Sequence, residues 1–327
     1  MNDFLLPVPD LSRWRAGNTG VEGVWRFQAP QAGPHVAVTA LMHGNELCGA
    51  WAVAGLLERL AGGATLRRGR LTLALCNLAA FDRFDAGLPD TSRFVEEDLN
   101  RQWSTARLAD GSTLERRRGA QLWPWLADAD RLLDLHSMHE PGSPLLLAGT
   151  LSRHVDFARA LGVAGHVVID AGHADGTRLR DFGAFGDPAA QAGALLLECG
   201  WHGDPHSRRV AEDAVFRLMR LTGCIDPAQL PAQWCLDTRP AAWALTVTQA
   251  VVARSIRFRF ARPWRNLQRV ARRGTLIGTD EDGPVCSPHD DCVLVMPSTR
   301  QLRPGVTVVR MARRAPLVPP RRGRGVS

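Results

Sequence analysis

The sequence predicts an α/β fold, in which helices flank a mixed sheet and a small all-β domain follows at the C-terminal end. Two observations carry this prediction. Up to residue 225, short apolar runs alternate with longer segments of helical periodicity, and that alternation is typical of layered α/β domains. Beyond residue 240, β-rich segments are separated by turn signals. A chain of 327 residues can bury one large core beside a small second domain.

The first predicted strand, "HVAVTAL", covers residues 35–41 and leads into the helix "ELCGAWAVAGLLERL" at 46–60. Three further apolar runs predict strands, and these are "RLTLALC" at 70–76, "RLLDLHS" at 131–137 and "GALLLEC" at 193–199. The segment "HSRRVAEDAVFRLMRLTG", residues 206–223, has apolar residues at helical spacing and ends at Gly223, which predicts an amphipathic helix. Strands interleaved with helices in this way favour a largely parallel or mixed sheet.

The helical rhythm stops after residue 225, where two prolines interrupt "DPAQLPAQW". We therefore predict an α/β domain over 1–225, a linker over 226–240 and a small β domain over 241–315. Turn signals at "DEDG" and "SPHDD" lie between the β-rich segments of that last domain. The remaining residues, 316–327, form a basic tail rich in proline and glycine, and we expect it to be disordered.

The positive charge comes from arginine alone, since the chain contains no lysine. A formal charge of +7 and an isoelectric point near 9.7 would suit a nucleic-acid binder. The densest basic segment is the C-terminal tail, however, and a solvated terminus is the simpler interpretation, so we do not expect nucleic-acid binding. Arginine suits bidentate recognition of carboxylate or phosphate, which favours a small anionic substrate.

No apolar run is long enough to cross a bilayer, and "MNDFLLPVPD" lacks the basic region of a signal peptide. The seven cysteines form no CxxC pair, which is typical of buried thiols in a reducing compartment. We therefore expect a cytoplasmic protein that does not bind membranes, and homo-oligomerisation is left open.

Polar residues follow the predicted strands where active sites of α/β proteins lie, at the carboxyl ends. His43 and Glu46 follow the first strand in "HGNE", and His136 ends the third. Two histidines and one carboxylate are a typical catalytic zinc set, with one position left for water. Asp134 lies on the same strand face as His136 and could orient it. His139 in "HSMH" is an alternative ligand, but its position beyond the strand end is less favourable.

The fourth strand ends in Glu198, a candidate general base that could take a proton from water and deliver it to a leaving amine. The segment "SRFVEEDLNRQW", residues 92–103, offers Arg93, Asn100 and Arg101. One arginine can stabilise an oxyanion, while Asn100 and Arg101 can clamp a substrate carboxylate. His202 and His206 in "ECGWHGDPH" are interpreted as loop residues at the rim of the site.

These motifs, "HGNE", "SRFVEEDLNR", "DLHS" and "LLLECG", occur in the order found in the succinylglutamate desuccinylase/aspartoacylase family. The chain resembles that family over roughly residues 35–220. The resemblance implies a zinc carboxypeptidase-like fold with a small β domain, and one zinc ion per chain held by His43, Glu46 and His136. It also implies Glu198 as the catalytic base, Arg93 as the group that polarises the scissile carbonyl, and Asn100 with Arg101 as the carboxylate site.

By the same resemblance, Asp98 would orient its neighbours, and Arg178 and Arg180 lie where the family places further substrate contacts. Two features depart from the family pattern. Leu78 follows Asn77 where the family has proline, and the chain has no tyrosine to shape an aspartoacylase-like pocket. The family resemblance therefore predicts the catalytic chemistry better than it predicts the substrate.

The sequence thus predicts a zinc-dependent deacylase that cleaves the amide bond of an N-acyl amino acid or a similar small carboxylate. One alternative is a carboxypeptidase-type amidase that acts on a small peptide with the same catalytic residues. A second alternative, from another class, is a basic nucleic-acid-binding protein with a vestigial metal site, and the complete set of ligands, base and arginines argues against it.

Overall fold

The computed structural model describes residues 4–173, 175–237 and 242–317, and it confirms the predicted α/β fold. Its described residues form an 11-stranded mixed sheet. In spatial order the strands are β1 (Val24–Gln28), β3 (Arg70–Leu75), β2 (His35–Ala40), β4 (Arg131–Met138), β7 (Gly193–Trp201), β5 (Leu145–Leu147), β6 (His166–Ile169), β8 (Trp243–Val252), β14 (Thr307–Pro316), β13 (Cys292–Val295) and β10 (Arg269–Val270). The four strands predicted from apolar runs are β2, β3, β4 and β7.

These four strands are parallel to one another, in the order β3-β2-β4-β7, so their carboxyl ends meet at one edge of the sheet. Their residues are almost all buried. Burial on both faces explains why the strands appear in the sequence as continuous apolar runs and not as alternating patterns.

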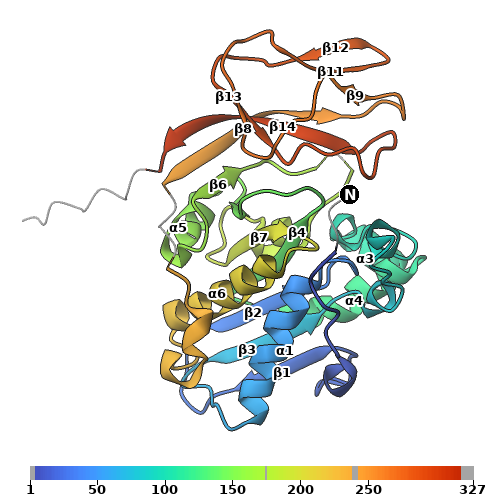
Figure 1. The fold of residues 1–327 in the computed structure, drawn as a ribbon. Coiled ribbons are helices and arrows are strands. Elements are labelled where there is room, and N and C mark those ends of the chain that lie inside the picture. The colour runs from blue at the N-terminus through green and yellow to red at the C-terminus, as the bar shows by residue number, and fades with distance from the viewer. Residues whose placement is uncertain (1–3, 174, 238–241, 318–327) are drawn as a thin grey trace, which may run out of the picture.

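Helices cover both faces of this parallel region (Figure 1). One face packs against α1 (Leu47–Ala61), α5 (Ser152–Leu161) and α6 (Pro205–Thr222), and the other packs against α4 (Leu114–Leu126). Two shorter helices are α2 (Leu78–Phe81) and α3 (Thr105–Asp110). The predicted end of α6 is confirmed at Gly223, whose φ of +65° closes the helix in a left-handed conformation.

The C-terminal part of the chain is rich in strands, as predicted, and it lies across the β6 end of the sheet (Figure 1, orange to red). Strand β8 pairs parallel with β6, so this region continues the main sheet. A second, three-stranded sheet contains β12 (Gly283–Cys286), β11 (Leu276–Asp280) and β9 (Arg259–Phe260). The predicted domain boundaries stay a prediction, and residues 238–240 of the linker and 318–327 of the basic tail lie outside the described residues.

Short 3₁₀ helices connect these elements, and several carry residues of the predicted site. They are η1 (Ser12–Trp14), η2 (Pro89–Ser92), η3 (Leu99–Arg101), η4 (Leu179–Asp181), η5 (Gly183–Phe185), η6 (Pro227–Gln229) and η7 (Ala232–Trp234). Among the described residues, no helix combines the length and the apolar character needed to span a bilayer. The cytoplasmic location stays a prediction.

Candidate active site

Strands β4 and β7 place two predicted site residues side by side. His136 and Glu198 are register partners across this parallel pair, at the carboxyl end of each strand. Asp134 lies two residues before His136, and because side chains alternate along a strand, both point to the same face of the sheet. The predicted edge of the sheet is therefore where these groups meet.

The "HGNE" turn brings the next two residues to that edge. Leu41, directly after β2, has φ of +55°, a left-handed conformation that redirects the chain. Gly44 sits so close to other backbone that an added Cβ would lie 2.3 Å from the carbonyl carbon of Ala80. Its amide donates a hydrogen bond to the carbonyl oxygen of Arg93 (3.1 Å), which joins the turn to the next motif. Glu46 then occupies the N-cap of α1, where the helix dipole favours a carboxylate.

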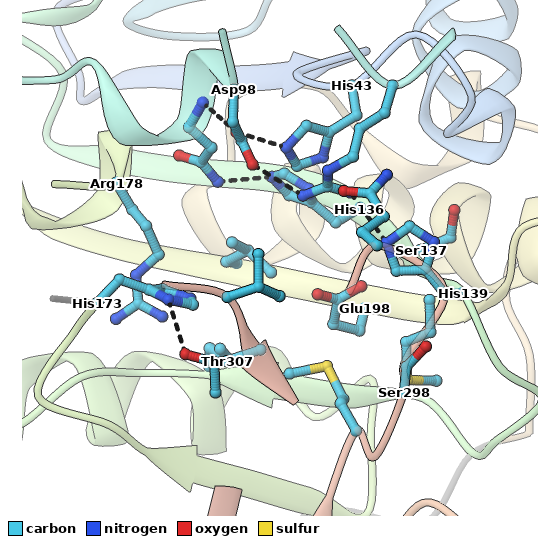
Figure 2. Close-up of a pocket in the computed structure, with 18 of the residues that line it drawn as sticks. His43, Asp98, His136, Ser137, His139, His173, Arg178, Glu198, Ser298 and Thr307 are labelled. Carbon is cyan, nitrogen blue, oxygen red and sulfur yellow. Dashed lines mark hydrogen bonds and ion pairs between the residues drawn. The ribbon is translucent and has the colours of Figure 1, made fainter. Parts of the chain in front are cut away.

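His43, Glu46 and His136 form a buried cluster whose potential ligand atoms all lie within 4.8 Å of one another. Glu46 lies between the two imidazoles, with Oε1 2.7 Å from Nδ1 of His43 and Oε2 2.7 Å from Nδ1 of His136. Burial alone would raise the pKa of Glu46, but the two histidines hold it well below its usual range. The three predicted ligands thus converge as an ionised carboxylate between two ring nitrogens (Figure 2).

The surroundings of these residues fit a divalent metal ion. Ligating histidines typically give their second ring nitrogen to a carboxylate, which fixes the tautomer and the orientation of the ring. Here Nε2 of His43 lies 2.9 Å from Oδ1 of Asp98, and Nε2 of His136 lies 2.8 Å from Oδ2 of Asp134. Both Nδ1 atoms are therefore left to face the centre of the cluster. This donor set matches the two-histidine, one-carboxylate pattern of catalytic zinc sites.

Glu198 lines the same pocket as the cluster. Its Oε2 atom is buried and has no hydrogen-bond partner among the described residues. Burial, followed by the charge of Glu46, raises the pKa of Glu198 to about 8. A carboxylate with a free oxygen and a raised pKa is suited to accept a proton near neutral pH.

Arg93 lies beside the cluster and lines the same pocket. Its Nη2 donates to Oδ2 of Asp98 (3.1 Å), and its Nη1 lies 3.4 Å from Oε1 of Glu46. Its guanidinium also lines the pocket that contains Glu198. The structure thus places a fixed positive charge beside the predicted metal ligands, and a charge of this kind can stabilise a developing oxyanion.

Asn100 and Arg101 also line the pocket. The amide of Asn100 has internal partners, because Oδ1 accepts from the backbone N–H of Leu179 (3.0 Å) and Nδ2 lies 3.4 Å from Nε2 of His136. Arg101 donates to the carbonyl of Asn100 (2.8 Å) and its Nη2 lies 3.2 Å from Nε2 of His173. Burial, opposed by Asp98 and assisted by nearby arginines, lowers the pKa of Arg101 to about 10.

The C-terminal strands complete the pocket with residues that the sequence analysis did not single out. Arg310 on β14 pairs with Asp170 (3.0 Å) and contacts the ring of His173, while Thr307 lies beside that ring (Figure 2). No motif surrounds these residues, and only the pairing of β14 with β8 brings them to the site. Arg310 lies within the predicted β domain, where its cationic side chain was the only available signal.

The two arginines of "TRLR", residues 177–180, lie at different cavities. Arg178 lines the pocket, and its buried Nη2 has no partner among the described residues. Arg180 is buried beside a second cavity, where it donates to the carbonyl of Leu147 (3.2 Å). Substrate binding by Arg180 stays a prediction. Of the other histidines, His139 lines the pocket, His202 is buried behind it and His206 is exposed.

A two-histidine, one-carboxylate cluster beside a free carboxylate and several arginines is typical of hydrolases that use a metal ion. Residues 32–177 match the model of the succinylglutamate desuccinylase/aspartoacylase catalytic domain. This segment is therefore similar to that catalytic domain, and the resemblance predicted from the motifs is confirmed.

Solved structures show the same fold at low sequence identity. Succinylglutamate desuccinylase from Vibrio cholerae is similar with a TM-score of 0.66 and 18% identity, over 89% of this chain and 85% of that one. The ectoine utilization protein EutE from Ruegeria pomeroyi, solved with bound product, has a TM-score of 0.64 and 17% identity, over 89% of each chain. A succinylglutamate desuccinylase/aspartoacylase from Rhodobacter sphaeroides has a TM-score of 0.62 and 18% identity, over 90% and 89%. No curated protein matches the chain in sequence.

Proposed function

We propose that this protein is a zinc-dependent deacylase that hydrolyses the amide bond of an N-acyl amino acid or a similar small carboxylate. One observation carries the proposal. The cluster of His43, Glu46 and His136 shares a pocket with Glu198, whose free carboxylate oxygen is buried without a partner among the described residues. A buried oxygen of this kind costs stability, and a catalytic role explains why the protein retains it.

His43, Glu46 and His136 would hold one zinc ion, which when bound supplies Lewis acidity. Glu198 would take a proton from the attacking water and later deliver it to the leaving amine. Arg93 would donate to the oxygen of the scissile carbonyl as negative charge develops there. Glu198 and Arg93 would then act on different atoms of the amide, and both line one pocket with the three predicted ligands.

The carboxylate of the substrate is proposed to bind on the His173 side of the pocket. Arg101, Arg178 and Arg310 line that side, and Nη2 of Arg178 is free of any partner in the described chain. Anionic ligands are favoured there because guanidinium groups can hold a carboxylate with two parallel hydrogen bonds. Asn100, with both ends of its amide engaged internally, would then support this site more than contact the ligand.

An apolar floor supports a substrate that also carries an apolar group. Leu147 on β5 and Leu196 on β7 are register partners, and both line the pocket. Met138 and Met296 line it as well. Flexible methionines accept apolar groups of different shapes, so we expect N-acyl leucine or methionine to be processed along with acidic substrates.

The experiment is a substrate screen with zinc-loaded protein. The panel contains N-acetyl, N-formyl and N-succinyl derivatives of leucine, methionine, aspartate and glutamate, the matching amides without a free carboxylate, and dipeptides with a free C-terminus. Release of free amine is measured, with Glu198→Gln as the control for background hydrolysis. The proposal is supported if the N-acyl amino acids are hydrolysed and the matching derivatives without a free carboxylate are not. Hydrolysis of dipeptides alone would indicate a carboxypeptidase-type amidase.

A further inference from the structure

Arg93 has a third partner outside the predicted metal cluster. Its Nη1 lies 3.4 Å from Nε2 of His139. Nδ1 of His139 in turn lies 3.1 Å from Oδ1 of Asp90 and 3.3 Å from Nε2 of His202. The chain of contacts ends at Ser137, whose Oγ lies 2.7 Å from Nδ1 of His202. These residues come from η2, from the end of β4 and from the turn after β7, and they form one connected network.

Elementary hydrogen-bond rules assign the protons in this network. A guanidinium can only donate, so Nε2 of His139 must accept from Arg93. The proton of a neutral His139 ring then sits on Nδ1 and faces the carboxylate of Asp90 and the Nε2 atom of His202. If Nε2 of His202 accepts, its own proton sits on Nδ1 and points to the hydroxyl of Ser137. Every ring nitrogen is paired when both histidines are neutral.

Burial favours that neutral state for both rings. It lowers the pKa of His139, against the opposing effect of Asp90. Burial and then the neighbouring His139 lower the pKa of His202 well below its usual value. The hydrogen-bond geometry and the surroundings of the rings therefore agree.

We propose that His139, held by Asp90 and His202, is a positioning residue that orients the guanidinium of Arg93 toward the scissile carbonyl. The inference deepens the proposed function, on which it rests for the role of Arg93. The other two partners of Arg93 are the carboxylates of Glu46 and Asp98. A carboxylate partner neutralises a guanidinium, whereas a neutral imidazole fixes it in place and leaves its positive charge available for the substrate oxygen.

The contact of His139 with Arg93 matters because Glu46, which also contacts Arg93, is a predicted metal ligand. As a predicted metal ligand, Glu46 would direct its oxygens toward the ion, which weakens its hold on Nη1 of Arg93. His139 contacts that same nitrogen and is separate from the three predicted ligands. It can therefore keep the guanidinium in place while Glu46 binds the metal.

The spacing of Asp90, His139 and His202 would also admit a cation, since their ligand atoms lie within 4.8 Å of one another. Two arginines oppose this alternative. A metal on Nδ1 of His139 would place the ring proton on Nε2, facing the donor Nη1 of Arg93. In addition, Nη1 of Arg300 lies 3.8 Å from the other carboxylate oxygen of Asp90. A hydrogen-bond network satisfies all these groups, whereas a second cation would be repelled.

The kinetic test compares His139→Phe with His139→Gln, whose amide oxygen can still accept from Arg93, and with the exposed control His206→Gln. With the best substrate from the screen, His139→Phe should lower kcat by roughly 10- to 100-fold at unchanged KM, because a misplaced catalytic group costs about this much. His139→Gln should recover most of the loss, and His206→Gln should match wild type. Zinc content should stay at one ion per chain in all three variants.

A double-mutant cycle separates positioning from a general structural effect. In the Arg93→Ala background, His139→Phe should cause no further loss of kcat, since there is no guanidinium left to orient. Losses that multiply in the double variant would overturn the proposal, as would a rise in KM alone for His139→Phe. Two zinc ions per chain, falling to one in His139→Phe, would instead assign the cluster as a second metal site.

A measurement without turnover keeps this inference separate from the proposed function. Nitrogen NMR of histidine-labelled protein should show His139 as the neutral ring with its proton on Nδ1. A neutral ring with the proton on Nε2, or an imidazolium at neutral pH, would overturn the network even in an active enzyme. If the screen finds no substrate, the proposed function fails, and the NMR tautomer alone decides whether His139 accepts from Arg93.

Discussion

His136 and Glu198 face the same pocket because they are register partners on adjacent parallel strands. One side chain is a predicted metal ligand and the other a predicted proton acceptor, so their separation is set by the spacing of neighbouring strands. Loops can shift between homologous proteins, but the register of a buried parallel pair is strongly specified. The relation between the predicted metal ligand and the predicted base is therefore built into the central sheet.

Glu198→Gln should lower turnover by roughly 10²–10⁴-fold. The amide keeps the size of the side chain but cannot accept the proton from water. Zinc content, measured by elemental analysis, should stay at wild-type level, because Glu198 is not among the predicted ligands. Loss of zinc in this variant would make Glu198 a ligand, and near-normal turnover would remove it from the mechanism.

Arg93→Ala and Arg101→Ala should have different kinetic defects. Arg93 is expected to act on charge that develops only in the transition state, so its loss should lower kcat by roughly 10²–10³-fold. Arg101 is expected to bind a carboxylate that is present throughout, so its loss should mainly raise KM. Steady-state kinetics of both variants on one substrate checks this, and an exchange of the two defects would exchange the two roles.

Gly44→Ala should destabilise the protein by roughly 1–3 kcal/mol, the usual cost of overpacking. An added Cβ would lie 2.4 Å from the carbonyl oxygen of Ser92 and 2.3 Å from backbone of Ala80, and backbone cannot move aside easily. The turn that carries His43 would shift, so zinc affinity should also fall. Gly165→Ala is the matched control, since its Cβ would meet nothing within 4 Å. Urea unfolding and zinc titration are carried out on both variants. A Gly44→Ala protein with wild-type zinc affinity would contradict the predicted shift of the turn.

His154 should make the metal-free protein sensitive to acid. Burial, together with the charges of Arg180 and Arg153, lowers its pKa from 6.5 to about 4. Between those values the unfolded chain binds the proton more readily, so stability is lost as the pH falls from 6.5 toward 4. At pH 5 this amounts to about 2 kcal/mol, since each unit of pKa shift corresponds to about 1.4 kcal/mol.

Urea unfolding of wild type and His154→Gln at pH 7 and pH 5 measures this contribution. The variant cannot take up the proton, so its free energy of unfolding should fall less between the two pH values. The comparison is made without zinc because release of the ion as its predicted ligands take up protons would otherwise add to the change. Equal losses in both proteins would show that His154 does not cause the acid sensitivity.

The predictable part of the site lies close to strand ends. His43, His136 and Glu198 each follow a run of apolar residues, and the parallel arrangement of such runs brings their ends together. The contact of His139 with Asp90 spans 49 residues, and its contact with His202 spans 63. Loop conformations determine both contacts, so sequence analysis could name His139 as an alternative ligand and His202 as a loop residue but could not join them to Arg93.

Sequence analysis could not predict the contribution of the C-terminal strands to the pocket, for a different reason. β-rich segments predicted the strands after residue 240, but not that β8 would pair with β6 and extend the main sheet. That pairing carries β14, and with it Arg310, to the pocket. Side-chain patterns describe which face of a strand is buried, whereas the choice of neighbouring strand depends on the whole fold.

The place of Arg310 in β14 has a consequence during protein synthesis. The predicted ligands His43, Glu46 and His136 leave the ribosome early, whereas Arg310 is made among the last residues of the described chain. Because N-terminal parts of a chain generally fold first, we expect the predicted metal ligands to come together before Arg310 is made. If the proposed roles hold, a product truncated before β14 should keep the predicted zinc site but lack Arg310, so loss of this strand should change substrate choice and not metal content.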